Sequence, residues 1–132
     1  MARGPLDTAQ PKKAQPGIHL IGDLYDCLGD TRYFYDKQAL RALCLHAVKR
    51  SGLTAVGDLF HQFGADGGVT GAVILAESHL AIHTWPEKRY VTLDVYVCNY
   101  SQDNREKAQQ LFHHIVETFA PKSPRIQCVD RE

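Results

Sequence analysis

The sequence predicts an α+β fold of two layers, in which two helices cover one face of a mainly antiparallel sheet. Two stretches have the apolar spacing of helices, and three apolar stretches between residues 69 and 98 are separated by short turns, as in hairpins. The length of 132 residues suits a single domain, expected over residues 18–132. The predicted order of elements is β-α-β-β-β-β-α-β.

The N-terminal part of the chain is expected to hold a tail, a strand and a helix. Residues 1–17 contain three of the six prolines and few large apolar groups, which predicts a flexible tail. A first strand is expected near 18–25. Residues 36–51 follow helical spacing, with Asp36 as the N-cap and Gly52 as the stop after the last turn.

Strands dominate the rest of the chain, and a second helix comes near its end. The capping-box spacing of Asp103 and Glu106 predicts where this helix begins, and Pro121 ends it. The elements are expected at 53–63, 69–76, 79–85 and 90–98 for four strands, at 104–119 for the helix, and in the closing RIQCVD for a last strand.

The sheet is expected to need a partner on its second face. Two helices in so short a chain cannot cover both faces, so we expect two copies to pair face to face into an αββα homodimer. The residues taken to make this second face apolar are Val73, Leu75, Leu93, Val95 and Val97.

Composition excludes several classes of protein. With 15 Lys+Arg against 15 Asp+Glu, the formal net charge is zero, which argues against a nucleic-acid binder. No apolar run approaches the length of a membrane span, so no membrane partner is expected. The four cysteines are scattered without a C-x-x-C pair, and free thiols favour the reducing cytoplasm.

Reactive side chains interrupt the most apolar part of the sequence. Glu77, Ser78 and His79 stand together before LAIHTW, where they contribute nothing to a core. His79 and His83 would lie on one face of a strand, but roughly 13 Å apart, so no metal site is expected. A hairpin of 79–85 with 90–98 would bring Cys98 back to Ser78, as acid–base or covalent chemistry requires.

These residues lie in motifs that resemble those of the prokaryotic S-adenosylmethionine decarboxylase proenzymes, a self-cleaving family that depends on a pyruvoyl group. The resemblance covers about residues 17–119. It is carried by HLIGDLY near the start, by FHQF before the glycine turn, and by LAESHLAIHTWPE followed by YVTLDVYVC.

The resemblance implies that the chain cuts itself between Glu77 and Ser78 into residues 1–77 and 78–132. The Ser78 hydroxyl would attack the carbonyl of Glu77 and convert the peptide into an ester. Elimination of Glu77 and hydrolysis would then leave a covalently bound pyruvoyl group at position 78. This group would form a Schiff base with the substrate and act as the electron sink for decarboxylation.

The resemblance also assigns roles to other residues. His83 would accept a proton during processing, and Cys98 would donate a proton to the decarboxylated carbon. Thr70, where a serine is expected, would support the acyl shift or be an ordinary β-branched strand residue. The substrate-binding residues would be Phe63 and Trp85 against adenine and Glu87 at the ribose hydroxyls.

Three functions remain open at this point. The first is decarboxylation of S-adenosylmethionine to S-adenosyl 3-(methylthio)propylamine, which supplies aminopropyl groups for spermidine biosynthesis. The second is the same scaffold acting on arginine or ornithine. The third is a non-processing regulatory relative, which would normally lack the serine, histidine or cysteine that are all present here.

Overall fold

The computed structural model describes residues 16–99 and 103–131. The tail expected at 1–17 lies outside the described residues except for its last two, and Gly17 already begins a strand. The elements in chain order are β1 (Gly17–Cys27), α1 (Arg32–Tyr35), α2 (Lys37–Arg50), β2 (Ala55–Gln62), β3 (Val69–Leu75), β4 (Ser78–Trp85), the 3₁₀ turn η2 (Pro86–Lys88), β5 (Tyr90–Val97), α3 (Arg105–Phe119) and β6 (Pro121–Arg131).

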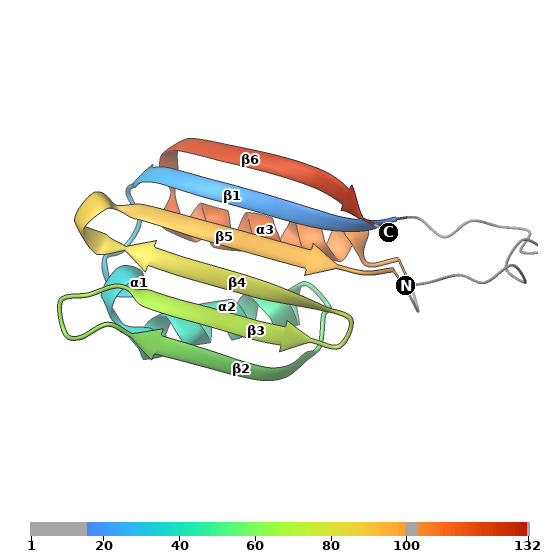
Figure 1. Cartoon of the computed structure of the whole chain (residues 1–132), viewed down its shortest axis with the longest axis horizontal. Coiled ribbons are helices and arrows are strands. Elements are labelled where there is room, and N and C mark those ends of the chain that lie inside the picture. The colour runs from blue at the N-terminus through green and yellow to red at the C-terminus, as the bar shows by residue number, and fades with distance from the viewer. Residues whose placement is uncertain (1–15, 100–102, 132) are drawn as a thin grey trace, which may run out of the picture.

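The strands form one antiparallel sheet within the described residues. Their spatial order is β2-β3-β4-β5-β1-β6, so the first strand lies between β5 and the last strand (Figure 1). β2 through β5 follow one another as hairpins, as the short turns in the sequence predicted. The closing strand is longer than the RIQCVD segment, because it pairs with almost the whole length of β1.

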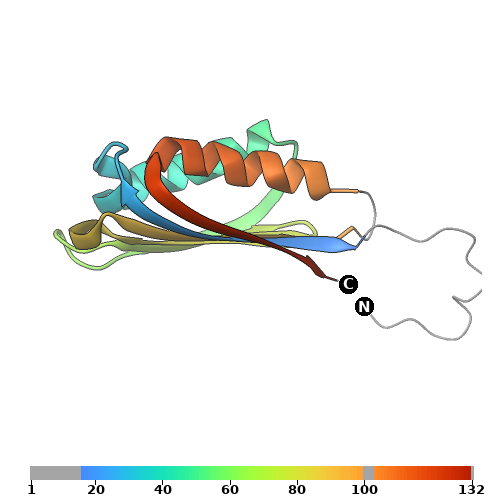
Figure 2. The ribbon, with the colours of Figure 1, turned by 90° about the horizontal axis from the view of Figure 1, so that it is seen from above.

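Both long helices lie on the same side of the sheet, which confirms the predicted two-layer architecture (Figure 2). Apolar positions alternate along each strand, so that one side of the pleat faces the helices. The largest fully buried side chains of the core are Phe34, Phe119, Ile18, Leu24, Leu40, Leu80, Ile82, Leu93, Leu111, Ile115, Val48 and Val69.

The two helices begin in different ways. The carboxylate of Asp36 accepts hydrogen bonds from the backbone N–H groups of Gln38 and Ala39, which confirms the predicted N-cap of α2. The capping box predicted for α3 is wrong. Asn104, not Asp103, is the N-cap residue, and its side chain makes no capping hydrogen bond.

A short helix that the sequence did not predict connects β1 to α2. Phe34 of α1 is buried and packs edge-on against Phe119 at a ring distance of 5.3 Å. The buried hydroxyl of Thr84 in β4 donates to the carbonyl of Phe34 at 2.9 Å. These contacts fix α1 over the ends of the central strands and make it part of the core.

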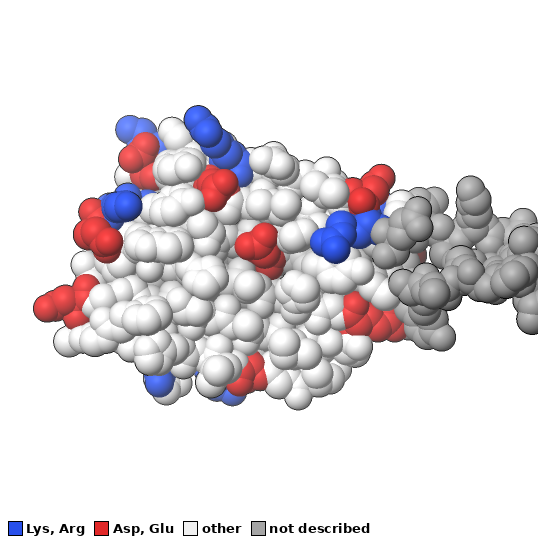
Figure 3. All heavy atoms as spheres, viewed as in Figure 1, with Lys and Arg blue, Asp and Glu red and all other residues white. Residues whose placement is uncertain are grey.

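The prediction of a second apolar face is wrong in its residues. The residues taken to form it lie in alternating positions of β3 and β5, and all of them are buried on the helix side: Val73, Leu75, Leu93, Val95 and Val97. The opposite side, which we call the open face, instead carries hydroxyls, imidazoles and aromatic rings. Figure 3 shows the open face as largely uncharged, with most of its charged side chains around the rim.

Candidate active site

The bond between Glu77 and Ser78 lies in the tight turn that joins β3 to β4. Leu75 pairs with Ser78 across this turn, and Ser78 pairs with Val97 of β5 on its other side. The predicted hairpin therefore brings Cys98 back to the turn. The backbone N–H of Cys98 donates to the carbonyl oxygen of Glu77 at 3.3 Å.

A buried asparagine that the sequence did not single out joins this group. Asn104 is 2% exposed, and its Nδ2 donates to Glu77 Oε1 at 3.3 Å and to the carbonyl of Cys98 at 3.0 Å. Its own backbone N–H donates to Asn99 Oδ1 at 2.8 Å. We call Glu77, Ser78, Cys98 and Asn104 the turn cluster.

A second group of side chains lies on the open face at the middle and far end of β4. The hydroxyl of Thr70 and Nδ1 of His83 are hydrogen-bonded at 3.1 Å, across the β3–β4 pair. The ring of His83 lies 5.9 Å from that of Trp85. The contact to His83 gives Thr70 a polar partner on the open face.

Trp85 packs against residues for which the sequence predicted no role. Its ring lies 5.2 Å from that of Tyr90, which also stacks on Tyr25 at 4.8 Å. The hydroxyl of Tyr90 donates to Asp23 Oδ1 at 2.7 Å, and this hydrogen bond raises the pKa of Tyr90 well above its usual value. We call Thr70, His83, Trp85, Tyr90 and Asp23 the open-face cluster. Their contacts span four strands, so no local sequence pattern could have joined them.

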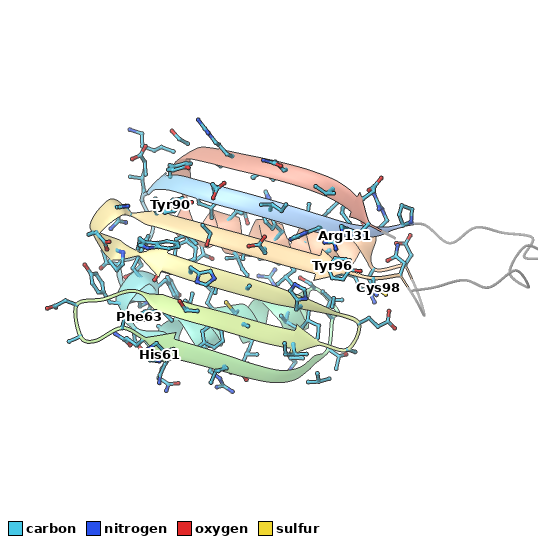
Figure 4. The ribbon with its side chains drawn as sticks, in the orientation of Figure 1. His61, Phe63, Tyr90, Tyr96, Cys98 and Arg131 are labelled. Carbon is cyan, nitrogen blue, oxygen red and sulfur yellow. The ribbon has the colours of Figure 1, made fainter. Side chains whose placement is uncertain are left out.

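The other expected substrate-binding residues lie at the same end of the sheet as Trp85. Phe63 follows β2 and is 58% exposed, with its ring 4.6 Å from His61. Glu87 is exposed in η2, directly after Trp85. Figure 4 shows Phe63 and Tyr90 at one end of the sheet and Cys98 at the other.

The structure does not bring all expected catalytic residues together within the single chain. Ser78 and Cys98 meet at the turn, but His83 is five residues along β4 from Ser78, a distance of roughly 16 Å in an extended strand. Trp85 is farther still, at roughly 23 Å. The short separation in sequence suggested that His83 lies close to Ser78 and Cys98. The extended backbone of β4 instead keeps His83 away from both.

Two further findings concern metals and membranes. His79 and His83 lie in a strand, as predicted, and within residues 16–99 and 103–131 there is no group of three or more His, Cys, Asp or Glu side chains that could hold a metal ion. None of the helices in the described segments has the length and apolar character needed to cross a membrane.

Comparisons with known proteins agree on one family. Residues 18–132 match the family described as S-adenosylmethionine decarboxylase. The S-adenosylmethionine decarboxylase proenzyme of Archaeoglobus fulgidus is 36% identical over 115 residues, which cover 87% of this chain and 96% of the relative. The corresponding proenzyme of Prochlorococcus marinus is 39% identical and covers 82% of this chain and 89% of the relative.

A solved structure extends the similarity to three dimensions. The crystal structure of the adenosylmethionine decarboxylase from Aquifex aeolicus superposes with a TM-score of 0.78 at 34% identity. The superposition covers 90% of this chain and 92% of the other. Sequence and fold therefore point to the same group of proteins.

Proposed function

Because the chain belongs to the S-adenosylmethionine decarboxylase family, we propose that it is a proenzyme which cuts itself between Glu77 and Ser78 and then decarboxylates S-adenosylmethionine. One observation carries the cleavage: the bond to be cut lies in a tight turn, with the N–H of Cys98 against its carbonyl oxygen. The product would supply aminopropyl groups for spermidine biosynthesis.

The turn cluster suits an attack by serine on the preceding peptide bond. Addition of the Ser78 hydroxyl to the carbonyl carbon of Glu77 places negative charge on the carbonyl oxygen. The N–H of Cys98 already donates to that oxygen at 3.3 Å, so it is in place to stabilise the charge as it develops. Self-cleavage needs no residue from outside the chain for this contact.

Position 78 also suits the expected cofactor. Ser78 is half-buried at the first position of β4, where it pairs with Val97, the residue before Cys98. A pyruvoyl group supplies a carbonyl that takes up the electrons released by decarboxylation. The Cys98 thiol would donate the proton that replaces the carboxylate.

The expected substrate-binding residues are too far from Ser78 to act on it within one protomer. A nucleoside-bearing amino acid spans much less than the roughly 23 Å between Ser78 and Trp85. We therefore propose a homodimer in which the open-face cluster of one copy, with Phe63 and Glu87, meets the turn cluster of the other. The largely uncharged open face with its charged rim supports this pairing (Figure 3).

Such a dimer would not use the residues first expected at its interface. The five residues first taken as a second apolar face are covered by the helices, so they contribute nothing to an interface. Two-fold pairing instead completes the site, because a closed symmetric dimer would create two equivalent combinations of turn and open-face clusters.

The cysteines support a reducing location. Cys27, Cys44, Cys98 and Cys128 are all free thiols, and the first two are buried. A proton-donating thiol at position 98 must stay reduced to act. We propose that the enzyme works in the cytoplasm.

Intact mass spectrometry of the purified protein tests the cleavage. We expect two fragments, residues 1–77 and 78–132, the second blocked by pyruvate, and a single uncut chain for Ser78→Ala. Release of carbon dioxide from S-adenosylmethionine, arginine and ornithine then tests the substrate. A folded wild-type protein that stays uncut, or that acts on arginine or ornithine instead, would contradict the proposal.

Mixed dimers test the shared site. Neither Ser78→Ala nor His83→Ala should be cleaved efficiently alone. Mixed together, they form heterodimers in which Ser78 of one copy meets His83 of the other, so the His83→Ala chain should now be cut. If the site lay within one protomer, mixing would change nothing.

A further inference from the structure

Asn104 is a buried polar residue whose contacts lead to the bond that is cut. It begins α3, yet its side chain makes no hydrogen bond that caps the helix. Both contacts of its Nδ2 instead go to the turn cluster, to Glu77 Oε1 and to the carbonyl of Cys98. The helix alone therefore gives no reason for an asparagine here.

The other end of the same side chain carries an unpaired acceptor. Asn104 Oδ1 is buried and has no hydrogen-bond partner among the residues that the structure describes. An unpaired buried acceptor lowers stability, and such groups occur at places where the residue has another task. The contacts of Nδ2 indicate what that task is.

We propose that Asn104 is a positioning residue for self-cleavage, an inference that rests on the function proposed above. Its Nδ2 bridges the side chain of Glu77 and the backbone of Cys98, while the N–H of Cys98 holds the carbonyl oxygen of Glu77. These three contacts close a loop around the carbonyl group that Ser78 must attack. Asn104 thereby keeps the oxyanion donor and the attacked carbonyl in register.

The reaction step shows what this alignment has to achieve. Ser78 Oγ bonds to the carbonyl carbon of Glu77, and the C=O electron pair moves onto the oxygen that faces the Cys98 N–H. When this pair returns, the bond from carbon to the Ser78 nitrogen breaks, and the nitrogen takes up the proton that Oγ has lost. Asn104 touches none of these atoms, so it acts through Glu77 and Cys98.

Exchanging the donor and the acceptor between Asn104 and Glu77 tests the hydrogen bond between their side chains directly. Asn104→Asp keeps the shape of the side chain but removes both donated hydrogen bonds, so we expect cleavage to slow about ten- to hundredfold. Glu77→Gln alone is the reference for the double variant, since its amide oxygen can still accept from Asn104 Nδ2. The double variant should cleave faster than Asn104→Asp, because the glutamine amide can donate to the new carboxylate.

Asp103→Ala is the matched control at the same end of α3. It removes the hydrogen bond from the Arg105 N–H to the Asp103 carboxylate, but it leaves the contacts of Asn104 in place. Its cleavage rate should equal that of wild type even where its melting temperature falls. If Asn104 acted only by stabilising the fold, the cleavage rate would fall with the melting temperature in both Asn104→Asp and Asp103→Ala.

Time courses of intact mass on the full-length chain decide between the outcomes. The inference is overturned if Asn104→Asp cleaves at the wild-type rate, or if adding Glu77→Gln to it restores nothing. Should Asn104→Asp fail to fold, Glu77→Ala removes the same contact from the turn, and a wild-type rate there would equally refute the inference. Wild-type protein that never cleaves would instead refute the proposed function itself.

Discussion

Replacing Thr70 by valine tests whether its hydroxyl works with His83. The two side chains are hydrogen-bonded at 3.1 Å in a half-buried part of the open face. Valine has the same branched shape and suits a strand equally well, so β3 should be unchanged. The substitution therefore removes one hydrogen bond from the histidine and little else.

The size of the effect tells two roles apart. A neutral hydrogen bond that merely orients the imidazole contributes about 1 kcal/mol, and its loss would slow cleavage about fivefold. A hydroxyl that transfers a proton in the acyl shift would contribute about a hundredfold or more. Thr70→Ser keeps the hydroxyl and should cleave at close to the wild-type rate in either case.

The assay is a time course of the uncut and cut masses under conditions where the protein is folded. Thr92→Val is the matched control, because Thr92 pairs with His83 from the β5 side. This substitution makes the same change of shape and polarity as Thr70→Val. Cleavage of Thr70→Val at the wild-type rate, or at the rate of Thr92→Val, would refute a specific role for the Thr70 hydroxyl.

Three more predictions concern catalysis and stability. Cys98→Ala keeps its backbone N–H, so cleavage should continue while turnover per cut chain falls about a hundredfold or more; normal turnover in a carbon dioxide assay would rule out the thiol as proton donor. The Arg89 guanidinium donates to the backbone carbonyls of Cys27 and Gly29. Arg89→Met should therefore lower the free energy of unfolding, measured in urea, by about 2–4 kcal/mol, whereas Lys88→Met at the exposed neighbouring position should not. Burial raises the pKa of the Cys44 thiol to about 12, against about 8.5 in the unfolded chain. The stabilisation by this group is complete below the unfolded value and is lost between about pH 9 and 12, so wild-type stability should decline more steeply in that range than that of Cys44→Ala; equal slopes would contradict this.

The sequence predicted the strands and the two long helices well because each of these has a local signal. Alternating apolar residues in YVTLDVYV and the apolar stripe of the second helix need no knowledge of the partner element. The same alternation was misread when Val95 and Val97 were assigned to a second apolar face. Thr92, Asp94 and Tyr96 occupy that face in β5, so Val95 and Val97 are buried on the side that the helices cover.

The candidate site was predictable in part. Glu77, Ser78 and Cys98 could be joined by pairing two neighbouring strands, which is a short-range inference. Asn104 could not, because its burial depends on how the chain returns from β5 to α3. The separation of His83 from Ser78 follows from strand geometry and was obscured by their closeness in sequence.

The place of β1 in the sheet determines what self-cleavage would leave behind. β1 belongs to residues 1–77, but it lies between β5 and β6, which both belong to residues 78–132. The two products would thus be interlocked, each completing a sheet that the other cannot form alone. Cutting the turn would convert the unfolding of each protomer from a one-chain into a two-chain process, so the stability of the mature enzyme should depend on its concentration more steeply than that of the uncut precursor. The two fragments of a cut enzyme that unfolds would have to find each other again, so at high dilution unfolding of the mature enzyme would become effectively a one-way step.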